Sequence, residues 1–161
     1  MKQIFKLSIF LLALTCCVSS FDANAKTKRK AKSATTFSKW VEVDRDYDSG
    51  FITYLQLPVS CDDEGYCYIT TKEVPMKGRL TDKRQHYVEV FHSKSFNKFT
   101  HRMAKVKVDI VNDRMTGESI VYYAGDVVLS SEGSLGLWIS PPVGTSGYEL
   151  IKATRLAVRG Y

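Results

Sequence analysis

The sequence lacks the short motifs that mark common catalytic sites. It contains no Gly-x-Ser-x-Gly nucleophile elbow, no phosphate-binding loop, no His-Glu-x-x-His motif and no nicotinamide-binding glycine fingerprint. Carboxylate pairs of the glycosidase type leave no short signature, so a small secreted hydrolase stays open as an alternative. A short, mostly β chain with no assembled site favours a protein that is not an enzyme and needs no cofactor.

The sequence has only one long apolar run, at residues 7–18. This run is too short to cross a bilayer as a helix, which needs about 20 residues. It follows Lys2 and Lys6 and precedes the small-x-small pattern of residues 23–25. The pattern predicts a signal peptide over residues 1–25 with cleavage after Ala25, and therefore export to the periplasm or the outside.

Membrane attachment depends on this leader and on the apolar content of the rest of the chain. Cys16 and Cys17 lie at the end of the apolar run, so lipoprotein anchoring at either cysteine is the alternative to cleavage after Ala25. Beyond the leader no further long apolar run occurs. We therefore expect no transmembrane helix in the mature chain.

The folded part of the chain lacks an excess of either charge. The net charge is +6, but basic and acidic residues are equal in number from Ser33 onward. The excess lies in the run Lys26–Lys32, which predicts a basic flexible tail at residues 26–36 before a domain at residues 37–161. This distribution excludes a nucleic-acid partner and leaves two interpretations of the tail, a solvated segment or attraction to an anionic surface polymer.

Cysteine is scarce after the leader, where only Cys61 and Cys67 remain. Strand-like segments flank the pair, and residues 63–65 suit a three-residue hairpin loop with Gly65 in the left-handed conformation. In that register the two cysteines lie opposite each other, at a separation that a disulfide requires. A redox centre would need Cys-x-x-Cys at a helix start, and a zinc site would need more ligands nearby. We therefore expect a structural disulfide.

Alternating apolar and polar residues recur to the end of the chain and predict about eight strands. The clearest alternation is at residues 105–111, where Val106, Val108 and Ile110 share one face. This pattern predicts an all-β domain, an antiparallel β-sandwich or barrel with at most one short helix. The expected strands lie at residues 39–44, 51–60, 66–74, 87–91, 105–111, 119–129, 134–140 and 148–158.

The helix candidate is residues 93–104. Phe96, Phe99 and Met103 fall at the spacing i, i+3, i+7, which would place one apolar face on the sheet. The segment is short, so an irregular crossover loop is the alternative.

Neither the acidic run nor the histidines predict a metal site. Asp44, Asp46 and Asp48 alternate like calcium ligands, but the glycine and glutamate that an EF-hand needs are not in register. His86 and His92 would be roughly 20 Å apart on one strand, so one ion could not join them. We expect no metal, although a carboxylate brought near His92 or His101 by folding stays open.

Aromatic residues offer the remaining functional signal. Tyr66 and Tyr68 flank Cys67, and Tyr122, Tyr123 and Trp138 lie on later expected strands. Such side chains stack on sugars or form protein hot spots when exposed, and fill the core otherwise. Alternation alone does not say which face is wet.

Together these observations favour an exported, non-enzymatic binding domain. Its partner would be a protein or an anionic surface polymer outside the cytoplasm, and the binding residues are not identified by the sequence. The first alternative is a structural subunit of a surface fibre or envelope complex that pairs through its sheet edges. The small hydrolase is the second.

Overall fold

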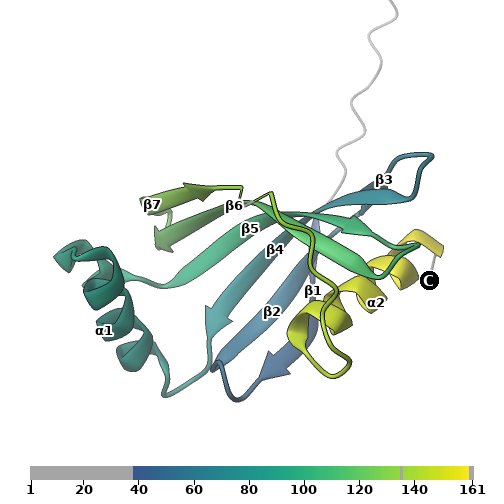
Figure 1. Ribbon diagram of the computed structural model, residues 1–161. Coiled ribbons are helices and arrows are strands. Elements are labelled where there is room, and N and C mark those ends of the chain that lie inside the picture. The colour runs from purple at the N-terminus through teal and green to yellow at the C-terminus, as the bar shows by residue number, and fades with distance from the viewer. Residues whose placement is uncertain (1–37, 135, 160–161) are drawn as a thin grey trace, which may run out of the picture. The chain divides into compact units, whose positions relative to one another are not determined.

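A computed structural model describes residues 38–134 and 136–159, which belong to one compact unit. The predicted signal peptide, the cleavage site at Ala25 and the basic tail lie outside the described residues. The described part is mostly β, with one antiparallel sheet and two α-helices (Figure 1). The strands are β1 (Lys39–Asp46), β2 (Phe51–Leu57), β3 (Ser60–Cys61), β4 (Tyr66–Pro75), β5 (His101–Asp109), β6 (Arg114–Ala124) and β7 (Val127–Gly133), and the helices are α1 (Leu80–Phe91), the short 3-10 helix η1 (Lys94–Lys98) and α2 (Ser146–Arg159).

The sheet is open. Its strand order is β1-β2-β4-β5-β6-β7, and β3 pairs with the first part of β4. The prediction of an all-β antiparallel domain is therefore confirmed only in part: the fold is mostly β and antiparallel, but a sandwich or barrel is not confirmed, and two α-helices of 12 and 14 residues replace the single short helix expected. In place of a second sheet, α1 lies near one end of the sheet and α2 near the other (Figure 1).

Both helices pack on the same face of the sheet, which we call the covered face. Under α2 the buried side chains are Leu55, Cys67, Ile69, Val106 and Val108, and the helix contributes Leu150 and Ile151 to this cluster. A second cluster joins α1 and η1 to Phe51 and Tyr122 through the buried side chains of Tyr87, Phe96 and Phe99. Side chains alternate along strands, so the residues between these buried ones point to the opposite face.

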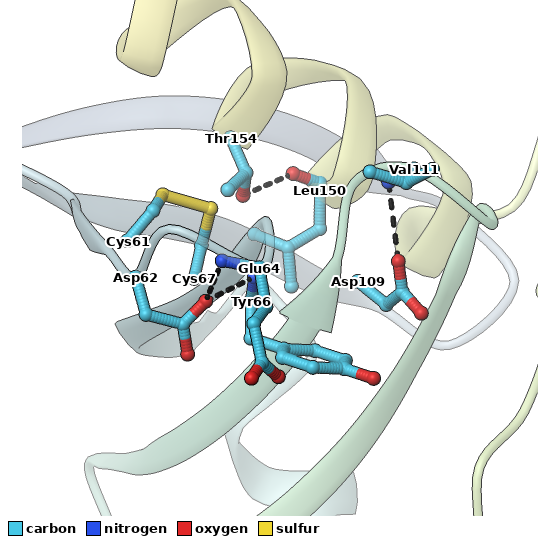
Figure 2. The surroundings of a disulfide bond; sticks show 9 residues. All are labelled: Cys61, Asp62, Glu64, Tyr66, Cys67, Asp109, Val111, Leu150 and Thr154. Carbon is cyan, nitrogen blue, oxygen red and sulfur yellow. Dashed lines mark hydrogen bonds between the residues drawn. A yellow bond between two sulfur atoms is a disulfide. The ribbon is translucent and has the colours of Figure 1, made fainter.

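The disulfide hairpin forms in the predicted register. Cys61 pairs with Cys67 across β3 and β4, and a disulfide joins them. The Asp62 backbone N–H donates to the Tyr66 carbonyl, and the Asp62 carboxylate accepts backbone N–H groups from Glu64 and Tyr66 (Figure 2). Gly65 has a φ of +87°, the left-handed conformation that glycine adopts without strain. The disulfide is therefore part of a tightly hydrogen-bonded turn.

The expected strand at residues 87–91 is wrong, because these residues are the end of α1. The alternation of Tyr87 to Phe91 looks like a strand in isolation. The partners in the second cluster are instead spaced as on a helix, with Leu80, Tyr87, Val88 and Phe91 packing together on one side. Tertiary packing of this stripe outweighs the β propensity of the two valines.

The expected strand at residues 148–158 is also wrong, because α2 occupies this segment. Its buried residues, Leu150, Ile151 and Thr154, follow helical spacing, and Thr154 Oγ1 donates to the Leu150 carbonyl (Figure 2). At the start, Thr145 Oγ1 accepts the Tyr148 backbone N–H and so caps the helix.

Two further predictions need correction. The helix expected at residues 93–104 is only η1, and β5 begins at His101. Phe96 and Phe99 are buried as expected, but Met103 lies on β5 and faces away from the helices, on the side opposite the covered face. The strand expected at residues 134–140 is reduced to a single antiparallel bridge between Met115 and Ile139, with residue 135 outside the described part.

Candidate binding surface

The face of the sheet opposite the helices, which we call the open face, is the candidate site. Neither helix contributes to it, since both pack into the two clusters on the covered face. By strand alternation and pairing, the central part of the open face carries a mixture of aromatic, aliphatic and cationic side chains. These residues are Ile52, Tyr54, Tyr68, Thr70, Lys72, Val74, Met103, Lys105, Lys107, Val121 and Tyr123.

One end of the open face holds an aromatic cluster around a lysine. The Lys107 ammonium lies 4.2 Å from the ring centre of Tyr66 and 5.2 Å from that of Tyr68. Trp138 tilts against Tyr66, with 5.8 Å between ring centres. Tyr68 is 48 % exposed and Trp138 37 % exposed, so both rings have a free edge or face. The hydrogen-bonding side chain of Tyr68, more than any other neighbour, raises the pKa of Lys107 above the ordinary lysine value.

Arg114 and Asp109 lie next to the aromatic cluster, and Arg114 contacts it through Trp138. The Arg114 guanidinium lies 4.9 Å from the Trp138 ring centre and its Nε donates to Asp109 Oδ2 at 2.8 Å. Burial would raise the pKa of Asp109, but hydrogen bonds from Asn112, Arg114 and the Val111 backbone lower it to about 2. Asp109 therefore neutralises Arg114, whereas no ion pair among the described residues includes Lys107.

The other end of the open face has a shallow hollow and a stacked histidine. Trp40, Tyr54, Lys72 and Val74 line the hollow. His101 stacks on Tyr123 with 4.9 Å between ring centres. Burial, followed by the positive charge of Lys72, lowers the pKa of His101. Lys72 therefore lies close enough to His101 to act on it, and the opposite charge of Asp126 offsets part of this effect.

Three lysines connect the two ends. Lys107 pairs with Tyr68, Lys105 with Thr70, and Lys72 with Met103 across the β4–β5 seam. We call Lys72, Lys105 and Lys107 the lysine row. Within residues 38–134 and 136–159, no ion pair includes a member of the row. The positive charge of the row is thus available to a ligand.

The acidic run at residues 44–48 has a structural role. The Asp46 carboxylate accepts the backbone N–H groups of Asp48 and Ser49, which closes the turn after β1. Ser146, at the start of α2, donates to Asp44 at 2.5 Å. Among the described residues no group of three His, Cys, Asp or Glu side chains could hold a metal ion. The run fixes α2 to the sheet edge.

The sequence indicated some of this surface. Tyr66, Tyr68, Tyr123 and Trp138 were candidates for exposed aromatics, and the structure places all four on the open-face side, whereas Tyr122 is buried in the second cluster. The lysine row was missed. Its signal was the polar half of the alternation at residues 105–107, but the link to Lys72 depends on the β4–β5 register, which the sequence does not show.

The chain was compared with protein-family models, with curated proteins and with solved structures, and none of the three comparisons finds a match.

Proposed function

We propose that this chain is an exported, non-enzymatic binding protein that holds a protein or a surface polymer outside the cytoplasm on its open face. One observation carries the proposal: in the described part of the chain, the sheet face that α1 and α2 leave uncovered presents half-exposed aromatic rings beside lysines that form no ion pair there. Rings of this kind stack on planar or apolar surfaces of a ligand, and the sheet supports them rigidly.

Other features support export without carrying the binding proposal. The leader pattern of residues 1–25 is typical of a signal peptide, and the Cys61–Cys67 disulfide suits an oxidising compartment. Independently of export, none of the helices in the described part of the chain has the length and apolar content that spanning a bilayer requires.

The proposal predicts that binding depends on open-face aromatics. We expect the double variant Tyr54→Ser/Tyr68→Ser to lose most binding on arrays of polysaccharides and of secreted and envelope proteins, because both rings leave the face. The control is Tyr47→Ser, since Tyr47 is 72 % exposed in the turn after β1, away from the open face. Equal binding by the double variant and the control, with both folded by circular dichroism, would contradict the proposal.

A structural subunit is the second candidate, and the open sheet favours it. In the described part of the chain β1 and β7 each pair with one strand only, which leaves an edge on both sides. Unpaired edges recruit strands from other chains. This candidate predicts concentration-dependent oligomers in size-exclusion chromatography with light scattering. A monomer at all concentrations is expected of the binding protein instead.

A further inference from the structure

The lysine row runs along the β4–β5 seam as a line of positive charge. Alternate residues on a strand are about 7 Å apart. Lys107 and Lys105 are separated by one such interval on β5, and Lys72 lies opposite Met103, one interval further along the seam. Tyr68 lies beside Lys107 at one end, and the hollow beside Lys72 lies at the other. An extended ligand along the seam would therefore contact one lysine at each of the three positions and aromatic side chains at both ends.

The chemistry of the row selects among possible occupants of the face. Lysine is depleted in the centre of protein–protein interfaces, so a row of three lysines there is unfavourable for a protein partner. A second copy would bring a like-charged face, and the basic run Lys26–Lys32 of the same chain carries the same sign. A ligand with regularly repeated negative charge complements the row.

We propose that the open face binds a linear acidic polysaccharide, one with carboxylate or sulfate groups, laid along the β4–β5 seam. The inference rests on the proposed function and names the ligand class. Lys72, Lys105 and Lys107 contact the acidic groups, and Tyr68 stacks on a sugar ring beside Lys107. The basic tail adds long-range attraction without defining the seam.

The experiment distinguishes binding by the lysine row from non-specific attraction by the net positive charge. The row variant is Lys72→Gln/Lys105→Gln/Lys107→Gln, and the control is Lys77→Gln/Lys94→Gln/Lys98→Gln, which removes the same charge from exposed lysines outside the open face. Both are made in the full-length chain, with and without Gln at the five basic residues of the tail. Binding to heparin, alginate and neutral dextran is measured by calorimetry at several salt concentrations.

We expect the row variant to bind heparin or alginate roughly tenfold more weakly than the control, since each exposed ion pair contributes modestly and three are lost. Its affinity should also depend less steeply on salt. Dextran should bind neither protein measurably. The difference between row variant and control should persist when the tail is neutralised.

Equal affinity of the row variant and the control for both acidic polymers overturns the inference. So does row-dependent binding to vesicles of anionic lipid with none to either polysaccharide. Binding of only a neutral polysaccharide or a protein, lost in Tyr54→Ser/Tyr68→Ser, overturns the inference while leaving the proposed function in place. A thermal melt of each variant checks that the sheet is folded, and Lys105→Gln alone serves if the triple variant is not.

Discussion

Replacing Ile151 by alanine is expected to lower the free energy of unfolding by about 3 kcal/mol. Ile151 is 1 % exposed and lies in the cluster that joins α2 to the sheet, with Leu55, Ile69 and Val106. The substitution removes apolar area from that cluster and leaves a cavity that a sheet cannot readily close. Urea denaturation followed by circular dichroism measures the loss.

Leu156→Ala on the same helix is the matched control. Leu156 is 50 % exposed, so we expect less than about 1 kcal/mol from its truncation. Similar losses for both variants would show that α2 does not dock on the covered face through Ile151. The assignment of the opposite face as open would then lose its basis.

Asp109→Asn is expected to cost about 2 kcal/mol at neutral pH, because a buried carboxylate loses its charge-assisted hydrogen bonds. The side chain is 2 % exposed and accepts hydrogen bonds from Asn112 and Arg114 and from the backbone of Val111. In the folded state the pKa is about 2, below the ordinary value of 3.8. The stabilisation is therefore present above about pH 4 and is lost as pH falls towards 2.

Denaturation curves between pH 7 and pH 2 measure both effects. The wild-type protein should lose stability over the last two pH units, and Asp109→Asn should lose less there. Asp63→Asn, in the exposed hairpin loop, should keep the wild-type profile at a cost below about 0.5 kcal/mol. An Asp109→Asn profile parallel to that of the wild type would contradict the lowered pKa.

The strands that the sequence predicts well are those with one wet and one buried face. β2 and β4 alternate between buried and more exposed residues, and the Cys61–Cys67 hairpin has turn residues that allow few other conformations. In these places local preference and tertiary packing agree, so a local pattern is sufficient.

The two α-helices are harder to predict from the sequence than these strands. In α1 the alternation of Tyr87 to Phe91 competes with a helical stripe whose partners, Phe96 and Tyr122, come from distant segments. In α2 a short amphipathic pattern at the end of the chain is compatible with either period until Leu150 and Ile151 meet the sheet. Each assignment depends on which surface is available for burial, and this is a property of the whole fold.

The sequence predicts which aromatic residues are candidates for the binding surface, but not where they lie on the sheet. The sequence marked Tyr66, Tyr68 and Trp138 as aromatics of interest, but their exposure depends on which face the helices cover. The lysine row requires β4 and β5 in register, so it exists only once the sheet has formed.

An NMR titration can locate the binding of an acidic polysaccharide on the open face. Isotopically labelled protein is titrated with a short heparin oligosaccharide, and shifts of backbone amide and lysine side-chain signals are followed. We expect the largest shifts at Tyr68, Thr70 and the lysine row, and none in α2. Shifts confined to the basic tail, or centred on α2, would contradict this expectation.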